Sequence, residues 1–362
     1  MRIVIMHETV TSHDAIGNDI ELMYEILHKQ HDCRVFALNQ FNKNIAYIDK
    51  AELERTIDDP ELVVIYHHSV NWEYGFKLLK RVKGRIIIRY HNITPPFFFE
   101  QYNDWNYEQC TRGRELTDRM QTALPGAYWL CDSEYNAGDL NAVKPEHIGV
   151  CPPFNKLESW SRIRPDEAVL SGLMDSDVVN LLFVGRVAPN KGHMMLLDAV
   201  RTYCACYDTR VKLRIVGKFD EGLPDYNDLI RSTIEAYGIE DNVEFIGEIN
   251  DSTLMAYYLG SDVMLCCSEH EGFCVPIVEA QYFGLPIVAL QSSAVPDTLG
   301  ENQLCFEWDA RVFAAAVRRI AENGEYRRLL RAAGRENYTA RFSQDKVTRL
   351  FLTELEKGLK VR

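Results

Sequence analysis

The sequence predicts an α/β fold made of two Rossmann-like, doubly wound parallel-sheet domains, and three observations support this. Short apolar runs rich in Val, Ile and Leu alternate with stretches of helical periodicity, the pattern of parallel strands joined by helical crossovers. The chain of 362 residues is long enough for two domains of ordinary size. A proline-containing segment at residues 151–154 separates two such alternating series.

The composition is that of an ordinary globular protein, with 46% hydrophobic and 26% charged residues. The net charge of -13 argues against general nucleic-acid binding, which requires a basic surface. No apolar run approaches the roughly 20 residues of a membrane span, and the apolar residues 1–6 are too few for a signal peptide. We therefore expect a cytoplasmic protein whose 10 scattered cysteines are reduced thiols rather than disulfides or zinc ligands.

The first alternating series predicts a domain over residues 1–155. Gly17 lies in the loop after the first strand, where it either lets the backbone approach a ligand or serves only the turn. His67, His68 and His91 follow two of the strands, at the edge of a parallel sheet where ligands bind. The expected strands are the apolar runs at residues 2–6, 33–38, 62–66, 85–90 and 128–131.

Two features of this domain each have two possible interpretations. Residues 97–99 are three phenylalanines after a pair of prolines, and we favour a plug in the first domain's core over an acceptor- or lipid-facing lip beside His91. A basic cluster lies at residues 77–85, where we favour a solvated helix face over contact with an anionic membrane or a phosphate-bearing acceptor. The basic cluster consists of Lys77, Lys80, Arg81, Lys83 and Arg85.

The second alternating series predicts a domain over residues 156–342, entered through a polar linker at residues 156–179. A final helix at residues 343–362, capped by Ser343, is expected to pack back on the first domain. The expected strands are the apolar runs at residues 181–184, 213–217, 243–247, 262–267, 287–290 and 304–306.

Residues 268–280 predict a glycine-containing loop and a helix that follow one of these strands. Pro276 suits the first turn of a helix, where its missing N–H costs nothing. The amides of Phe273, Cys274 and Val275 would then point out of the helix start, at the positive end of the helix dipole. Such amides predict an anion-binding site.

Four charged side chains complete this expected site. Glu271 lies in the loop and Glu279 on the helix, so two carboxylates bracket the anion site. Arg186 and Lys191 lie on either side of a short loop after another strand, where two long cations can converge on one phosphate pair. Taken alone, such a pair is more often surface charge. Together, the four residues predict a ligand with both phosphates and sugar hydroxyls.

These motifs resemble the retaining glycosyltransferases of family 4, which have the GT-B fold of two Rossmann-like domains facing across a cleft. The resemblance covers the whole chain, is strongest between Asn180 and Ala289, and rests on several motifs in the right order and spacing. A looser similarity at residues 14–18 and 90–95 is to bacterial members acting on surface polysaccharides. The motifs are Gly185-Arg186 with Lys191-Gly192, Phe245-Ile246-Gly247, Glu271-Gly272-Phe273 through Glu279-Ala280, and Gly284-Leu285-Pro286.

The resemblance implies an acceptor-binding first domain and a second domain that binds the nucleotide-sugar donor. Arg186 and Lys191 would bind the donor diphosphate, and Glu271 the hydroxyls of the donor sugar. Glu279 would bind the ribose hydroxyls, and His91 would meet the donor sugar from the first domain. The other implied donor contacts are Gly17, Gly185, Ile246, Gly247, Ile249, Asp251, Phe273, Cys274 and Val275.

We expect a metal-independent front-face displacement, in which the departing diphosphate accepts the proton of the acceptor hydroxyl. Arg186, Lys191 and the helix start would stabilise the diphosphate, so the expected catalytic groups are these two cations, His91 and Glu271. No cofactor is expected, and no metal site. Residues 67 and 68 are adjacent histidines on a strand and point to opposite faces, and the Asp-Ser-Asp of residues 175–177 lies in the linker.

The favoured donor is GDP-mannose, because Asp251 could accept hydrogen bonds from guanine. Asp251 could instead only cap the next helix, and a UDP-hexose is nearly as well supported. The expected acceptor is a saccharide or lipid-linked saccharide in surface polysaccharide synthesis, with peripheral contact to the inner face of the membrane left open. Two other functions also remain open: a nucleotide-sugar 2-epimerase, and a catalytically silent scaffold of the same fold.

Overall fold

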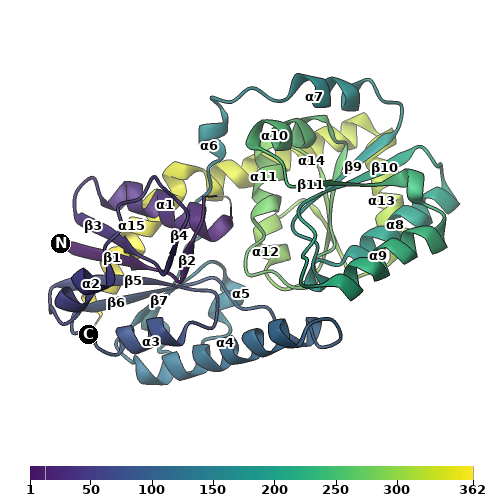
Figure 1. Ribbon diagram of the computed structural model, residues 1–362. Helices are drawn as coiled ribbons and strands as arrows, with labels where there is room; N and C mark the ends of the chain where they lie inside the picture. The colour runs from purple at the N-terminus through teal and green to yellow at the C-terminus, as the bar shows by residue number, and fades with distance from the viewer. Residues whose placement is uncertain (13, 362) are drawn as a thin grey trace. The chain divides into compact units, whose positions relative to one another are not determined.

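Figure 1 shows a computed structural model of the protein, which describes residues 1–12 and 14–361. The chain divides into two compact units. The first comprises Met1–Pro96, Trp105–Lys156 and Ser343–Arg362, and the second comprises Phe97–Asp104 and Leu157–Phe342. These divisions fall beside the predicted boundaries at 155/156 and 342/343, except that the segment Phe97–Asp104 groups with the second unit.

The first unit is built on a parallel sheet with the strand order β3-β1-β5-β6-β7-β8. Every residue of β5 is buried, as expected for a strand that is covered on both faces. The order runs outward from β1 in both directions, so the topological switch point lies between β1 and β5. The strands are β1 (Arg2–Met6), β3 (Asp32–Phe36), β5 (Leu62–His68), β6 (Arg85–Tyr90), β7 (Tyr128–Cys131) and β8 (Ile148–Val150), with a separate pair β2 (Thr9–Val10) and β4 (Asn39–Gln40).

Helices cover both faces of this sheet. Val63 and Ile65 of β5 belong to the same hydrophobic core as α1 and α15, whereas Val64 and Tyr66 belong to the core of α2, α3 and α4. Since alternate residues of a strand point to opposite faces, the two cores lie on opposite sides of the sheet. The helices are α1 (Ala15–Leu27), α2 (Lys50–Thr56), α3 (Glu73–Leu79), α4 (Asp104–Ala123), α5 (Glu134–Ala137) and α15 (Gln344–Lys360).

The second unit repeats this plan with the strand order β11-β10-β9-β12-β13-β14. The chain moves outward from β9 through β10 and β11 and then continues on the other side with β12, so its switch point lies between β9 and β12. The strands are β9 (Val179–Val184), β10 (Val211–Val216), β11 (Val243–Gly247), β12 (Val263–Cys266), β13 (Ile287–Leu290) and β14 (Leu304–Phe306).

The segment expected to be a linker contains two short helices instead, α6 (Leu157–Trp160) and α7 (Glu167–Met174). The Asp166 side chain caps α7 by accepting hydrogen bonds from the amides of Ala168 and Val169, at 3.1 and 3.2 Å. A helix of this length shows little periodicity, which explains why the sequence indicated a linker. The other helices are α8 (His193–Cys206), α9 (Pro224–Tyr237), α10 (Asp251–Gly260), α11 (Val275–Phe283), α12 (Val295–Leu299), α13 (Ala310–Glu322) and α14 (Gly324–Asn337).

The expectation that residues 97–99 plug the core of the first domain is wrong, because these residues belong to the second unit. Phe99 is 3% exposed, whereas Phe97 is 62% exposed. A short 3-10 turn, Pro96–Phe98, carries the chain into this segment. The three rings therefore do not act as one apolar plug.

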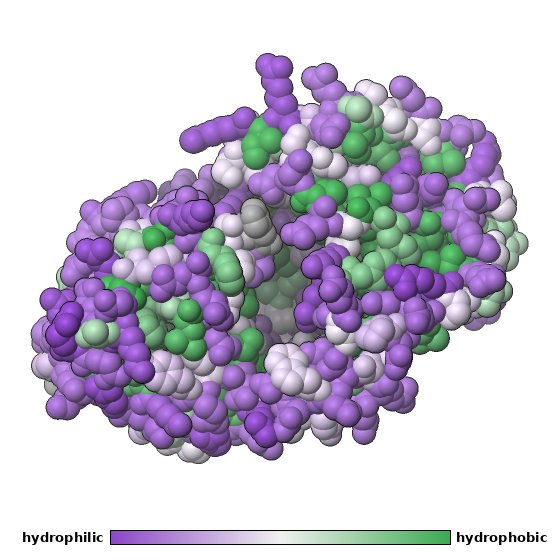
Figure 2. All heavy atoms as spheres, in the orientation of Figure 1, coloured by the Kyte–Doolittle hydropathy of each residue, from purple (hydrophilic) through white to green (hydrophobic). Residues whose placement is uncertain are grey.

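The surface shown in Figure 2 is mostly hydrophilic, with apolar residues scattered in small groups. This distribution fits the charged composition of the chain. Among the described residues, no helix combines the length and the apolar character that crossing a membrane requires.

Helix α15 supplies a test of how the first unit is stabilised. Phe351 is 1% exposed, and its ring packs 5.4 Å from that of Phe154. We predict that Phe351→Ala lowers the free energy of unfolding by about 3–5 kcal/mol, because it leaves a cavity in this core. Chemical denaturation followed by tryptophan fluorescence measures the loss. The neighbouring Leu352 is 39% exposed, so Leu352→Ala serves as the control, and an equal loss in both variants would contradict the assignment.

Candidate active site

Close backbone approaches shape the carboxyl edge of the second unit's sheet. Gly185 follows β9 with a φ of +154°, and Gly217 follows β10 with a φ of +150°. A Cβ at Gly217 would lie 2.0 Å from the Gly185 carbonyl oxygen, so only glycine fits there. The Gly217 amide donates to the Gly247 carbonyl oxygen at 2.9 Å. Two expected donor contacts, Gly185 and Gly247, are thereby brought to one edge.

A short turn after β9, Pro189–Lys191, lies against the end of β12. Gly192 follows the turn with a φ of +69°, and a Cβ there would lie 1.9 Å from the Cys267 carbonyl oxygen. The Glu269 amide donates to the Asn190 carbonyl oxygen at 2.9 Å, which ties the turn to the loop after β12. The loops that follow β9 and β12 therefore meet at the switch point, where open parallel sheets bind ligands.

Lys191 and Glu271 form an ion pair at this meeting point, with 2.6 Å between Nζ and Oε1. Burial favours the neutral amine, but the charge and hydrogen bond of the Glu271 carboxylate, together with the nearby Cys274, outweigh burial and raise the pKa of Lys191 above its ordinary value. The Glu271 amide donates to the Ser293 hydroxyl at 2.8 Å, which fixes the loop. Two of the expected catalytic residues are thus in direct contact.

Arg186 lies farther out on the same edge. Its side chain is 59% exposed, and its guanidinium Nη1 is 3.7 Å from Asp220 Oδ2. At this distance the pair is an exposed, loosely held one, which contributes little to stability. The guanidinium is therefore free to turn toward a ligand. Sequence reasoning did not identify Asp220.

The start of α11 carries the expected anion-binding amides. Cys274 precedes the helix with a φ of +74°, a left-handed conformation that is uncommon for a residue with a side chain. The Thr298 hydroxyl donates to the Phe273 carbonyl oxygen at 2.5 Å and holds this turn. Within the described part of the chain, the amides of Phe273, Cys274 and Val275 have no acceptor. Val275 is the first residue of the helix, and the other two directly precede it.

Glu279 lies on the same helix, near the residues that are expected to border the base of the donor. The Tyr258 hydroxyl donates to Glu279 Oε2 at 2.6 Å. Burial raises the pKa of Glu279 to about 7, with the Tyr258 hydrogen bond opposing the shift and the Asp251 carboxylate adding to it. Tyr258 was not predicted, because its position on α10 carries no motif.

Asp251 is not the cap of α10, so that alternative interpretation is wrong. The side chain of Asn250 caps the helix by accepting from the Thr253 amide at 3.0 Å, and Asp251 is an exposed first residue of the helix. Ile246 and Ile249 are partly buried and pack against the same core as Val275. The strand end, Asp251 and Glu279 therefore lie in one neighbourhood of the second unit.

In the first unit, Gly17 lies in the first turn of α1 rather than in an open loop. Its amide donates to the Asp14 side chain at 2.6 Å, which caps the helix. A Cβ at Gly17 would lie 2.1 Å from the Thr11 carbonyl oxygen, so the preceding loop packs closely on the helix. The Gly17 amide is thus already engaged, and an expected phosphate contact would have to replace the cap.

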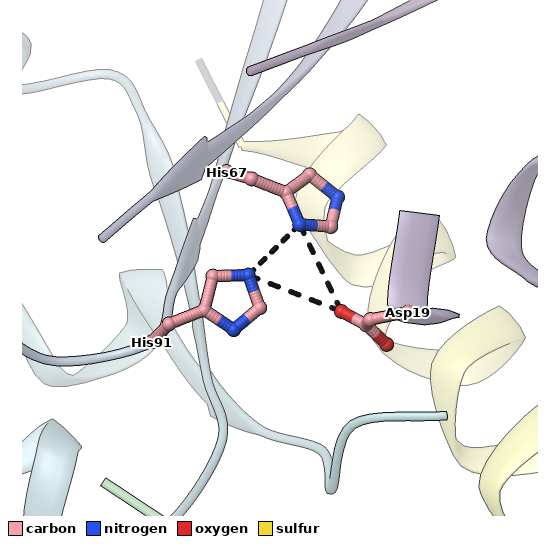
Figure 3. A group of neighbouring side chains, drawn as sticks. All are labelled: Asp19, His67 and His91. Carbon is pink, nitrogen blue, oxygen red and sulfur yellow. Dashed lines mark hydrogen bonds and ion pairs between the residues drawn. The ribbon is translucent and has the colours of Figure 1, made fainter. Parts of the chain in front are cut away.

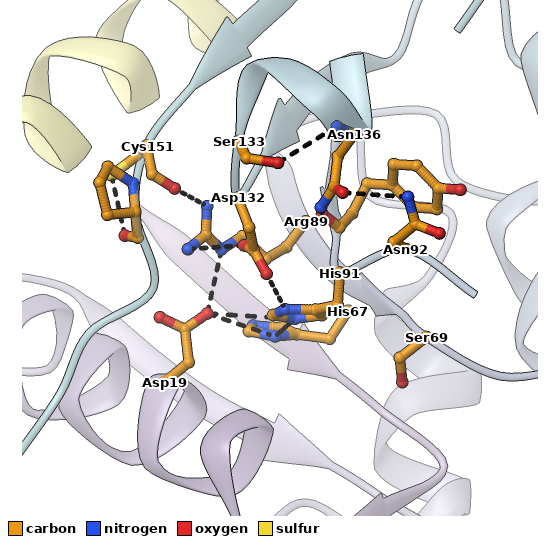
Figure 4. A network of polar contacts seen from close by, with 12 residues as sticks. Asp19, His67, Ser69, Arg89, His91, Asn92, Asp132, Ser133, Asn136 and Cys151 are labelled. Carbon is orange, nitrogen blue, oxygen red and sulfur yellow. Dashed lines mark hydrogen bonds and ion pairs between the residues drawn. The ribbon is translucent and has the colours of Figure 1, made fainter. Parts of the chain in front are cut away.

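Below this turn, a buried guanidinium joins four elements (Figure 4). Arg89 lies 3.0 Å from Asp19 Oδ2 and 3.0 Å from Asp132 Oδ1, and it donates to the Cys151 carbonyl oxygen at 2.7 Å. Although burial opposes the charge, the carboxylates of Asp132 and Asp19 raise the pKa of Arg89. Each of the three guanidinium nitrogens of Arg89 thus has a partner, which is what a buried charge requires. Sequence reasoning did not identify it.

His91 joins this network through both ring nitrogens. Its Nδ1 is 2.8 Å from Asp132 Oδ2, and its Nε2 is 2.8 Å from His67 Nδ1 (Figure 3). Burial lowers the pKa of His67 well below its ordinary value, and the positive charge of neighbouring groups lowers it further. The sequence predicts that His91 contacts a donor sugar. Such a contact would have to replace one of these two hydrogen bonds.

Asp19, His67 and His91 also form the type of side-chain group that can ligate a metal ion. The Asp19 oxygen lies 3.8 Å from His67 Nδ1 and 4.0 Å from His91 Nε2. The same oxygen accepts from the Arg89 guanidinium, whose charge would oppose a cation there. His68 points elsewhere, with Nε2 2.8 Å from the Thr117 hydroxyl, which confirms that residues 67 and 68 face apart.

The part of the second unit that carries the expected donor site matches a known protein family. Residues 172–337 match the family model described as glycosyl transferases group 1. This stretch of the second unit is therefore similar to the group 1 glycosyl transferases. The matched stretch contains Arg186, Lys191, Glu271 and Glu279, so the second half of the predicted site lies inside it.

Curated relatives match across both units. An uncharacterized 41.2 kDa protein in the cps region of Klebsiella pneumoniae is 23% identical over 68% of this chain and 65% of its own length. The MMP alpha-(1->4)-mannosyltransferase of Mycolicibacterium hassiacum is 29% identical over 68% of this chain and 57% of its own length. The chain therefore spans less than two thirds of the length of these relatives.

A solved structure shows the fold of the chain as a whole. Anabaena Alr3699/HepE, in complex with UDP and glucose, matches with a TM-score of 0.78 and 15% identity, over 98% of this chain and 99% of that one. At this level of identity the match shows the fold. The GT-B fold expected from the sequence is thereby confirmed.

The raised pKa of Glu279 predicts how stability depends on pH. Its carboxyl has an ordinary pKa of 4.5 and a pKa of about 7 in the folded protein. The protonated form is therefore favoured by folding, so Glu279 contributes stability below pH 4.5 that is lost as the pH rises to about 7. We predict that Glu279→Gln melts with a flatter pH dependence across this window than the unsubstituted protein. Parallel melting curves for the two proteins would contradict the buried carboxyl.

Proposed function

We propose that the protein is a retaining glycosyltransferase that moves a hexose from a nucleotide sugar to a saccharide or lipid-linked saccharide. One observation carries this proposal: the Lys191–Glu271 ion pair and the unpaired amides at the start of α11 occur at the switch point of the unit that is similar to the group 1 glycosyl transferases. The amides and the cation suit a diphosphate, and the carboxylate suits sugar hydroxyls.

Lys191 and Glu271 exchange partners in the proposed donor complex. A diphosphate at the helix start attracts the Lys191 ammonium, because two phosphate charges compete with one carboxylate. Glu271 then becomes available to accept hydrogen bonds from the donor sugar. Arg186, which is exposed and loosely paired, turns toward the same diphosphate.

The proposed reaction is a front-face displacement without a metal ion. The bond between the anomeric carbon and the diphosphate oxygen breaks, and its electron pair stays on the diphosphate. The acceptor hydroxyl forms the new bond on the same face and passes its proton to the departing diphosphate oxygen. Lys191, Arg186 and the α11 amides stabilise the charge that develops there, which is usually the largest catalytic contribution.

The proposed donor is GDP-mannose, with a UDP-hexose as the alternative. The exposed Asp251 carboxylate beside Glu279 supports guanine, since it can accept hydrogen bonds from that base. The name of the Mycolicibacterium relative supports mannose. The UDP and glucose bound to the Anabaena protein support the alternative. Asp251→Asn would weaken the binding of a guanine nucleotide and leave the binding of a uracil nucleotide unchanged.

The proposed setting is surface polysaccharide synthesis in the cytoplasm, with peripheral contact to the inner face of the membrane. The basic cluster at residues 77–85 is the surface we propose for that contact. Lys77, Lys80 and Lys83 are exposed, whereas Arg81 is engaged by Glu54 and Asp58. The cluster is thus only partly neutralised and keeps a local positive charge on an acidic protein.

Donor identity is tested by thermal melting with GDP, UDP and ADP, followed by product analysis with the matching nucleotide sugar. A ligand at about 100 times its Kd stabilises a protein by about 2.7 kcal/mol, so the native nucleotide should raise the Tm most. Incubating the donor without acceptor separates the alternatives. Epimerised donor would show a 2-epimerase, and no stabilisation by any nucleotide would show a silent scaffold.

Arg186 provides a test of the charge-stabilising role. We predict that Arg186→Ala lowers kcat by about 100- to 1000-fold, because one group that stabilises the departing diphosphate is lost. Arg210 is a comparably exposed arginine of the same unit, paired with Asp208, so Arg210→Ala is the matched control and should retain activity. Transfer of radiolabelled sugar measures both. A loss of less than about threefold in Arg186→Ala would exclude this role.

A further inference from the structure

Helix α14, labelled in Figure 1, carries four arginines that line one groove of the second unit. Residues 327, 331 and 335 recur every four positions, so they form one row on the helix surface, and residue 328 lies beside the row. An open groove of about 370 Å³ runs along them. The groove is lined by Gly324, Arg327, Arg328, Arg331, Ala332 and Arg335.

Two of these arginines are fixed by contacts within the unit. Arg327 Nη1 lies 2.9 Å from Asp262 Oδ1. Arg335 donates to the Phe283 carbonyl oxygen at 3.2 Å, at the carboxyl end of α11. Gly284 leaves the space for it, since a Cβ there would lie 2.6 Å from Arg335 Nε. The two ends of the row are therefore held in place.

The other two arginines have no such partners. Within the described residues, neither Arg328 nor Arg331 forms a hydrogen bond or an ion pair with the protein. Partial burial lowers the pKa of the Arg331 guanidinium, and the charges of Arg335 and Arg327 lower it further. Like charges spaced four residues apart destabilise a helix. The helix thus carries concentrated positive charge in a chain whose net charge is -13.

The lining of the groove suits an oxyanion by its charge. It consists of four arginines and two small residues, Gly324 and Ala332. Gly324 is the first residue of α14, which places the positive end of this helix at the groove. Planar guanidinium groups match phosphate oxygens through paired hydrogen bonds.

We propose that this groove binds a phosphate group, held between Arg328 and Arg331 and flanked by Arg327 and Arg335. The site is separate from Arg186, Lys191 and the start of α11, and it does not depend on the proposed transfer reaction. A soluble phosphate compound and the headgroup of an anionic lipid offer the same chemistry, and the two sources are separated by experiment.

The test compares binding of inorganic pyrophosphate to three variants by isothermal titration calorimetry. Arg328→Gln with Arg331→Gln should weaken pyrophosphate binding at the α14 site by at least about tenfold, since two groups that form charge-assisted hydrogen bonds are lost. Arg186→Ala should retain this binding, which separates it from the donor site. Arg349 is a 75% exposed arginine of α15, so Arg349→Gln is the matched control and should bind as the unsubstituted protein does.

Arg328 and Arg331 lie at exposed positions, and equal Tm values for all variants check that the substitutions leave folding intact. A second arm measures sedimentation with vesicles of phosphatidylcholine alone or with phosphatidylglycerol. Binding to the anionic vesicles that is lost in the double variant identifies a lipid headgroup, and pyrophosphate binding alone identifies a soluble source. The proposal is overturned if neither probe binds, or if the double variant binds both as tightly as the control.

Discussion

One close backbone approach organises the candidate active site: the Pro189–Lys191 turn lies directly against the end of β12. It depends on Gly192, because a Cβ at that position would meet the Cys267 carbonyl oxygen at 1.9 Å. With the turn in place, Lys191 reaches Glu271 at 2.6 Å across the switch point of the sheet. A larger residue would push the turn outward and separate the two charges. The packing of the backbone therefore determines where the charged side chains of the site lie.

The two units share a topology but use the same sheet edge differently. In the first, Arg89 has two carboxylates and a carbonyl oxygen as partners, and both nitrogens of His91 are engaged. Buried charges persist only when they are paired in this way, so the charged groups of this edge are already engaged by one another. In the second, Lys191 pairs with one carboxylate, that of Glu271, and the helix start keeps unpaired amides. The second edge is thus the one ready to receive an anion.

The fold and the second half of the site follow from the sequence, because strand-end glycines, a proline at a helix start and charged residues at fixed spacing are local signals. The network of Asp19, Arg89 and Asp132 does not, since it joins residues from separate elements and each one alone is unremarkable. Residues 97–99 were assigned to the wrong unit for the same reason: contact partners of an aromatic residue are set by tertiary packing. Asn250 and Asp251 show the limit of local signals, because either residue could cap α10 and only the backbone decides between them.

If Glu271 holds the donor sugar while Glu279 and the α11 amides hold the nucleotide, a substitution of Glu271 should change the affinity for the nucleotide sugar but not weaken that for the nucleotide alone. The most direct measurement is calorimetric titration of Glu271→Gln with the nucleoside diphosphate and with the matching nucleotide sugar. We predict that the diphosphate binds at least as tightly as to the unsubstituted protein, because Lys191 no longer has a competing carboxylate, while the nucleotide sugar binds more weakly. Equal weakening of both ligands would contradict the proposed division of the site.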